Sequence, residues 1–164
     1  MAAIAVVAID VLYVSLIAGQ GGPPSDTPLV APFVGAYFAV LAISLGVSLV
    51  SPMWLKSALR GAATGGLLLM AVLTGFSIGV AVLVAAAIAL AALVITLAAR
   101  PNRGTVIAAI TGAVVGVGVL MAGLQFAWSD VVCPASGQGG GTMPSLVGPG
   151  ASYQCNEGVL TVQR

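Results

Sequence analysis

This chain of 164 residues is 60% hydrophobic and 5% charged, with a net charge of +1 and no histidine. An ordinary soluble domain has about 25% charged residues, so the composition indicates a membrane protein. The weak net charge provides no basic field for nucleic acid, and the absence of histidine removes the commonest metal ligand and general base. We therefore expect no nucleic-acid partner, no metal and no cofactor.

The first two apolar stretches predict two membrane-spanning helices. Residues 1–19 are apolar apart from Asp10 and a serine, and they are just long enough to span a bilayer. They lack the basic start and the clear cleavage site of a signal peptide, so we expect a retained first helix. Residues 20–32 contain four prolines and Asp26, which predicts an external loop before a second span over 33–51.

The longest uncharged run of the chain predicts a helical hairpin. Residues 61–99 contain no charged side chain and are about twice as long as one crossing requires. Gly75 and Gly79 interrupt the aliphatic sequence near its middle, where a turn is expected. The sequence therefore predicts helices over 61–76 and 79–99.

Basic residues bracket that run and set the predicted orientation. Lys56 and Arg60 precede it, and Arg100 and Arg103 follow it. The positive-inside rule places both open ends of the hairpin in the cytoplasm. Residues 52–60 then form the first cytoplasmic loop, with a short interfacial helix as an option.

A fifth apolar stretch over 105–128 completes the predicted fold class. We expect an all-α integral membrane protein, in which a five-helix transmembrane bundle over 1–128 has its N-terminus inside and its C-terminus outside. A small external tail over 129–164 follows. The acids assigned to the outside are Asp26, Asp130 and Glu157.

The Ala, Val and Gly bias suggests a GC-rich bacterial genome, so the expected location is the bacterial cytoplasmic membrane with an extracytoplasmic tail.

The tail contains both cysteines of the chain. Disulfides persist in oxidising compartments, so a structural bond between Cys133 and Cys155 agrees with an external tail. Neither a Cys-x-x-Cys spacing nor a neighbouring basic residue indicates a redox pair. The Gly-rich run over 137–141 is expected to be the loosest point, and 130–133 and 158–163 have the β-branched character of a small antiparallel pair.

Asp10 is the ionisable residue expected deepest in the bilayer. Acids in that position are costly and are functional candidates by default. Tyr13 shares its helix face at i, i+3, so the two residues are an intramembrane polar candidate pair. The alternative that we favour is a structural one, in which protonated Asp10 bonds to a neighbouring helix. Hydroxyl groups available for such a bond are those of Thr64, Thr74, Ser77, Thr96 and Thr111.

Small residues predict close helix packing. Gly61 and Gly65, and likewise Gly112 and Gly116, have the Gly-x-x-x-Gly spacing that lets helix backbones approach each other. The pattern indicates tight packing either within the chain or against other subunits.

These features leave three hypotheses for function. The first is a non-catalytic accessory or scaffold subunit of a larger bacterial membrane complex, in respiration, transport or envelope biogenesis, with membrane lipid and other subunits or a second copy as partners. The second is a small transporter or channel component in which Asp10 lines a pathway. The third is an integral-membrane enzyme acting on lipid, with Asp10, Tyr13 or external acids as catalysts. The sequence favours a protein that is not an enzyme, because paired carboxylates and histidine are missing.

Overall fold

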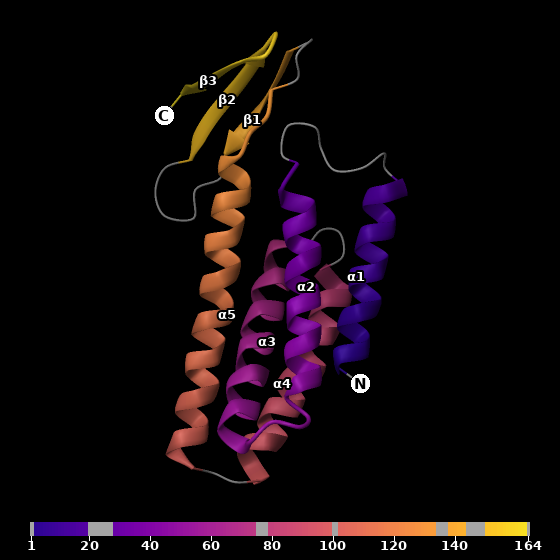
Figure 1. Cartoon of the computed structure of the whole chain (residues 1–164), viewed down its shortest axis with the longest axis vertical. Coiled ribbons are helices and arrows are strands. Elements are labelled where there is room, and N and C mark those ends of the chain that lie inside the picture. Colours follow the sequence, from indigo (N-terminus) through magenta and orange to yellow (C-terminus); the bar gives the residue numbers. More distant parts are fainter. Residues whose placement is uncertain are drawn as a thin grey trace. The chain divides into compact units, whose positions relative to one another are not determined.

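The computed structural model describes residues 2–19, 28–74, 79–99, 102–133, 138–143 and 150–163. Over these residues the protein is mostly helical, with five α-helices followed by three β-strands (Figure 1). The helices are α1 (Ala2–Gly19), α2 (Val30–Val47), α3 (Met53–Leu73), α4 (Gly79–Ala99) and α5 (Arg103–Ser129). The strands are β1 (Gln138–Met143), β2 (Ala151–Asn156) and β3 (Val159–Gln163).

Four of the described helices, α1, α2, α4 and α5, are long and apolar enough to cross a membrane. The remaining helix, α3, has 21 residues but contains Lys56 and Arg60 in its N-terminal half. These apolar helices indicate a membrane-embedded protein, which is the coarse architecture that composition predicts.

Helix α2 is displaced toward the N-terminus relative to the predicted span over 33–51. It begins at Val30 and includes Pro32 in its first turn, where the missing N–H of proline breaks no helical hydrogen bond. It ends at Val47, and the Ser48 hydroxyl then donates to the carbonyl oxygen of Leu45 at 2.7 Å.

Helix α3 begins at Met53, so most of the segment predicted as a cytoplasmic loop over 52–60 is helical. Pro52 supplies the first acceptor, because the backbone N–H of Lys56 donates to the Pro52 carbonyl at 2.8 Å. The loop expectation rested on the basic residues, and the helix considered as an option for this segment is present and continues into the rest of α3. Charge reports how deeply a segment lies in a membrane and does not prevent its backbone from forming a helix.

By contrast, α4 has the predicted bounds and α5 differs by two residues at its start and one at its end. Asn102 caps α5, since the backbone N–H of Gly104 donates to Asn102 Oδ1 at 3.1 Å. The turn expected at 75–79 lies mostly outside the described residues. Gly79, the first residue of α4, donates its backbone N–H to Thr74 O at 3.0 Å.

The chain forms two compact units. The first comprises Met1–Ser15 and Gly35–Leu120, and it contains the hairpin of α3 packed against α4. Its largest fully buried apolar side chains are Val6, Phe38, Leu67, Met70, Val82 and Leu120. Small residues fill much of the remaining interior, so the helix backbones in this unit lie close together.

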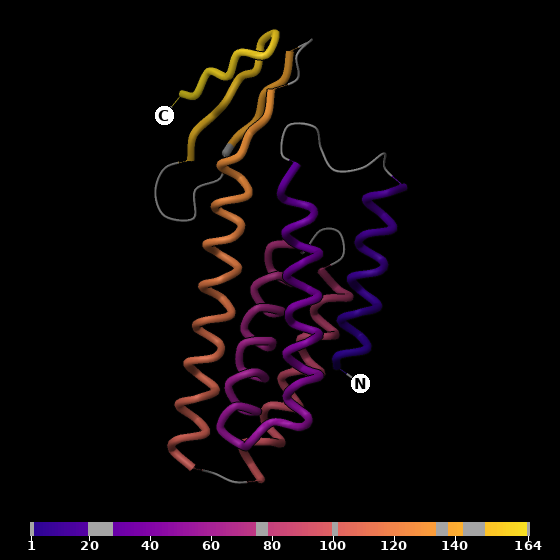
Figure 2. The backbone as a smooth tube through the Cα atoms, viewed as in Figure 1, coloured from indigo at the N-terminus to yellow at the C-terminus, as the bar shows by residue number. Residues whose placement is uncertain are grey.

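The second unit comprises Leu16–Val34 and Met121–Arg164. It contains an antiparallel sheet of order β1-β2-β3, which the tube in Figure 2 traces in orange and yellow. Glu157 and Gly158 join β2 to β3 with φ values of 47° and 82°, the positive pair typical of a type I′ hairpin turn.

The sheet differs from the predicted strand pair. Residues 130–133 are not a strand, and β3 pairs with β2 instead. Gly139, Gly140 and Gly141, expected at the loosest point of the tail, belong to β1. A Cβ on Gly141 would lie 2.8 Å from Tyr153 Oη, so the Tyr153 ring covers the glycine that it pairs with across the strands. An aromatic ring over a cross-strand glycine compensates for the missing side chain.

Candidate functional site

Asp10 lies in α1 and faces α2 within the first unit. Its Oδ1 atom is buried and has no hydrogen-bond partner among the described residues. A Cβ on Gly35 of α2 would lie 3.5 Å from this oxygen, so the glycine makes room for the carboxyl group. The bond from Asp10 Oδ1 to a neighbouring helix, which the structural interpretation expects, is therefore not seen here.

Tyr13 lies one turn further along α1, and its ring packs edge to face against Phe38 of α2. The ring centroids are 6.4 Å apart with an interplanar angle of 63°. No hydrogen bond joins Tyr13 to Asp10 in the described part of the chain. The two residues share a helix face, as their spacing predicts, but Tyr13 contributes to packing instead of completing a polar pair.

Three of the hydroxyl groups considered as partners for Asp10 donate to carbonyl oxygens of their own helices. Thr64 donates to Arg60 O at 2.8 Å, Thr74 donates to Met70 O at 2.7 Å, and Thr96 donates to Ala92 O at 2.7 Å. Ser77 lies outside the described residues. Such i−4 bonds satisfy the hydroxyl locally and leave it less available to another helix.

The four predicted packing glycines meet at one contact between α3 and α5, which we call the glycine seam (Gly61, Gly65, Gly112 and Gly116). A Cβ on Gly65 would lie 2.9 Å from the carbonyl oxygen of Ala113 in α5. At the other three glycines a Cβ would overlap the facing carbonyl oxygens, which belong to Ala109, Ala58 and Ala62. The two backbones therefore touch directly, so the seam lies inside the chain.

Tyr37 of α2 ties a third helix to this contact. Its hydroxyl donates to the carbonyl oxygen of Gly116 in α5 at 2.7 Å. The same hydroxyl occupies the position that a side chain on Gly66 of α3 would need. Tyr37 is 4% exposed, so its bond is made in a dry interior. The sequence does not reveal this hydrogen bond. Aromatic residues near the end of a membrane span are common at the membrane interface, so the position of Tyr37 alone does not indicate a contact with another helix.

Arg60 is the second residue whose position sequence analysis missed. It lies in the second turn of α3, and its guanidinium reaches the turn after α2, and α4, through three oxygen atoms. Nη1 donates to Ala92 O at 3.0 Å and to Thr96 Oγ1, while Nε lies 3.4 Å from Ser48 Oγ. These acceptors are all uncharged, so the hydrogen bonds among the described residues do not neutralise the positive charge of Arg60.

The predicted disulfide is confirmed in the second unit. Cys133 and Cys155 are bonded, with Cα atoms 5.4 Å apart. The bond joins the segment after α5 to the central strand β2, and Cys155 is 3% exposed. It therefore anchors the sheet to the end of α5 through a covalent link, as a structural disulfide does.

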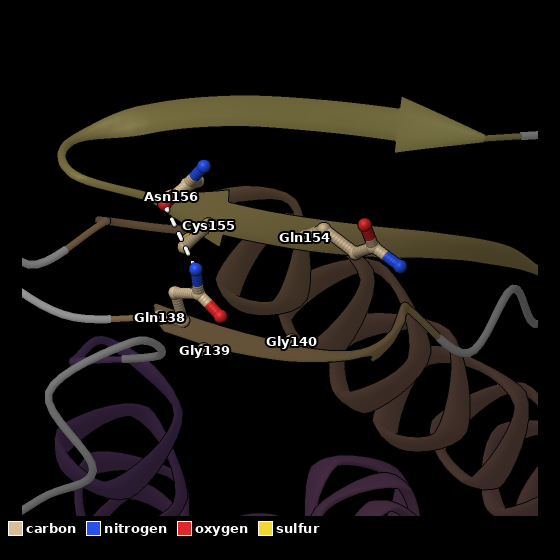
Figure 3. Close-up of a pocket in the computed structure, with 6 residues that line it drawn as sticks. All are labelled: Gln138, Gly139, Gly140, Gln154, Cys155 and Asn156. Carbon is tan, nitrogen blue, oxygen red and sulfur yellow. Dashed lines mark hydrogen bonds between the residues drawn. The ribbon is translucent and has the colours of Figure 1, made fainter.

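A pocket of about 520 Å³ lies over β1 and β2 (Figure 3). Its lining residues are Gln138, Gly139, Gly140, Gln154, Cys155 and Asn156. The Gln138 side-chain amide donates to Asn156 Oδ1 at 3.4 Å across the strands. A Cβ on Gly139 would meet no atom within 4 Å, and the side-chain amides of the lining residues both donate and accept hydrogen bonds.

Strand β3 forms an edge of the sheet, and its five residues are all exposed. Val159, Leu160 and Val162 are exposed by 64%, 41% and 45%. Proteins usually protect such an edge with charges, prolines or a covering segment, because its unpaired peptide groups can bind another strand. The edge is therefore a candidate docking surface.

Comparison of the chain with protein-family models, with curated proteins and with solved structures finds no match. Among the described residues, no group of three or more Cys, Asp and Glu side chains lies together in a way that could hold a metal ion. The fold and these sites define a mostly helical, membrane-embedded protein with a disulfide-bonded C-terminal sheet.

Proposed function

We propose that this protein is a non-catalytic accessory or scaffold subunit of a larger complex in the cytoplasmic membrane of a bacterium. The observation that carries the proposal is the exposed edge strand β3 on a sheet anchored by a disulfide. A rigid sheet with an apolar edge is suited to dock an extended segment of another subunit. The respiratory, transport and envelope-biogenesis complexes named from the sequence remain the candidate assemblies.

The orientation that we propose has five crossings, with the N-terminus inside and the tail outside. The part of α3 that follows Lys56, at about 1.5 Å per residue, is close in length to the roughly 30 Å hydrocarbon core. Its Lys56 is placed at the cytoplasmic boundary and Trp54 beside it, as for an interfacial anchor.

The direction of α5 supports this orientation. Ala58 of α3 faces Gly112 of α5, and Ala62 faces Gly116, so residue numbers rise together along the two helices. Parallel helices begin on the same side of a membrane. If α3 begins in the cytoplasm, α5 does too, and the tail that follows α5 is external.

The free side of β3 can be assigned from the hairpin register. The two-residue turn makes Asn156 and Val159 a hydrogen-bonded pair. Hydrogen-bonded and non-hydrogen-bonded pairs alternate along an antiparallel ladder. The peptide groups of Leu160 and Val162 therefore point away from β2, toward an incoming strand.

The test uses Val162→Pro, which removes one outward N–H group and leaves the ladder to β2 intact. The matched control is Val162→Ala, which shortens the side chain but keeps that donor. We expect the proline variant to retain about fivefold less of a co-purifying subunit than the control, since one net hydrogen bond is about 1 kcal/mol. Equal retention by the two variants would show that subunits do not dock through the edge of β3.

A second candidate function is a transporter or channel component, and the buried Oδ1 of Asp10 favours it. A carboxyl oxygen without a hydrogen-bond partner in a membrane helix is energetically costly. Acidic residues in membrane helices therefore often line a proton or ion pathway. The discriminating variant is Asp10→Asn, which keeps the shape and removes the ionisable group. Loss of proton or cation flux into proteoliposomes, with folding unchanged, would support transport. Absence of flux in the wild type would oppose it.

A further inference from the structure

Arg60 lines a cavity in the first unit. The cavity has a volume of about 220 Å³, roughly seven times the 30 Å³ that a water molecule occupies in the liquid. Its lining residues are Ala2, Ala3, Leu45, Ser48, Leu49, Arg60, Ile88 and Ala92. They come from the start of α1, the end of α2 and the turn that follows it, the first half of α3 and the middle of α4.

Arg60 supplies the formal charge among these lining residues. Its described hydrogen bonds to Ser48, Ala92 and Thr96 hold the guanidinium in place without cancelling that charge. An arginine has five N–H donors in a planar fork, and these bonds use its Nε and Nη1 atoms. A fixed guanidinium beside a cavity is suited to bind phosphate or carboxylate oxygens.

The rest of the lining is mainly apolar. Leu49, in the turn after α2, and Ile88 of α4 line the cavity, and they are also exposed by 68% and 37%. The cavity therefore adjoins the apolar surface that would contact lipid. A ligand that matches this arrangement has an anionic group next to a hydrocarbon chain.

We propose that the cavity at Arg60 binds the phosphate group of an anionic phospholipid, with the start of an acyl chain along Leu49 and Ile88. In the proposed orientation the cavity faces the cytoplasmic leaflet, whose surface is negatively charged. The inference requires a membrane-embedded chain and does not depend on the accessory role.

The experiment measures lipid retention by native mass spectrometry of the full-length protein in mild detergent. The probes are phosphatidylglycerol, which is anionic, and phosphatidylcholine, which has a phosphate but no net charge. Arg60→Gln removes the charge, and Lys56→Gln is the matched control one helical turn earlier on α3. We expect Arg60→Gln to retain at least about tenfold less phosphatidylglycerol, while Lys56→Gln retains as much as the wild type.

A second variant is needed because a misfolded Arg60→Gln protein would also lose lipid. Ala92→Leu fills the cavity, leaves Arg60 in place and keeps the Ala92 carbonyl that accepts its hydrogen bond. It should lose phosphatidylglycerol while its thermal unfolding in detergent stays cooperative. Undiminished retention by both Arg60→Gln and Ala92→Leu would overturn the proposal, as would equal retention of the two lipids by the wild type.

A free phosphate ion can accept the same hydrogen bonds from Arg60 as a lipid phosphate group, so the two ligands must be distinguished. Inorganic phosphate at millimolar concentration is therefore added to delipidated protein, and thermal unfolding is followed. If phosphatidylglycerol raises the melting temperature and inorganic phosphate does not, the lipid assignment stands. If inorganic phosphate alone produces the same Arg60-dependent rise, the site binds a free ion and the lipid assignment is wrong.

Discussion

At Gly112 the missing side chain is what allows α5 to touch α3. A Cβ there would overlap the carbonyl oxygen of Ala58, which is backbone and has no rotamer to change. Gly118 lies further along the same helix and has no atom within 4 Å of a Cβ built on it. Gly112 therefore faces the backbone of another helix, whereas a side chain on Gly118 would meet open space.

This difference leads to a residue-scale prediction. Gly112→Ala should lower the free energy of unfolding by about 1–3 kcal/mol, because the added methyl group must separate two packed backbones. Gly118→Ala should cause no loss, since alanine favours a helix over glycine by up to about 1 kcal/mol. The measurement is detergent-based unfolding followed by circular dichroism. Equal destabilisation by the two substitutions would contradict direct contact at the seam.

Sequence reasoning reached some of these residues and not others. The four seam glycines were identified because their spacing reflects a physical need for close approach. The partner helix was not identified, since spacing does not say what lies opposite. Arg60 was assigned to a loop because a charge next to Lys56 suggested a membrane boundary. Its hydrogen bonds to the turn after α2 and to α4 depend on how the helices pack together. The local sequence around Arg60 does not show this packing.

At the scale of elements, uninterrupted apolar helices were the most predictable. Helix α4 has no charge or proline along its length, so its bounds follow from Gly79 and the basic residues after it. Strand β1 was not predicted, because three consecutive glycines have little intrinsic preference for a strand. Pairing with β2 and the cover provided by Tyr153 decide its conformation.

The disulfide provides an element-scale prediction. It closes a loop with a sequence separation of 22, which in the chain-entropy account is worth about 3 kcal/mol. The double variant Cys133→Ser, Cys155→Ser should therefore lose about 100-fold in amide-exchange protection across β2 and β3, at 1.4 kcal/mol for each tenfold change. Protection in α3 and α4 should not change. A sheet that remains equally protected would show that strand pairing alone holds the tail.

At the scale of the whole molecule, the proposed orientation predicts which residues are accessible from outside the cell. Single cysteines are introduced at Thr142 in the tail or at Asn102 before α5, both of which are exposed. With a membrane-impermeant maleimide, Thr142→Cys should react in intact cells and Asn102→Cys only after permeabilisation. The reverse pattern would place the tail in the cytoplasm and would also disagree with the basic residues around Asn102.

If this protein is a subunit of a larger membrane complex, the proteins that stay bound to it when it is purified at native expression reveal that complex. The tagged chain would be purified in mild detergent, sized under native conditions and analysed by mass spectrometry together with everything that stays bound. We expect defined membrane-protein subunits in a fixed ratio to this chain. A protein that runs alone, or only as copies of itself, would contradict the accessory role.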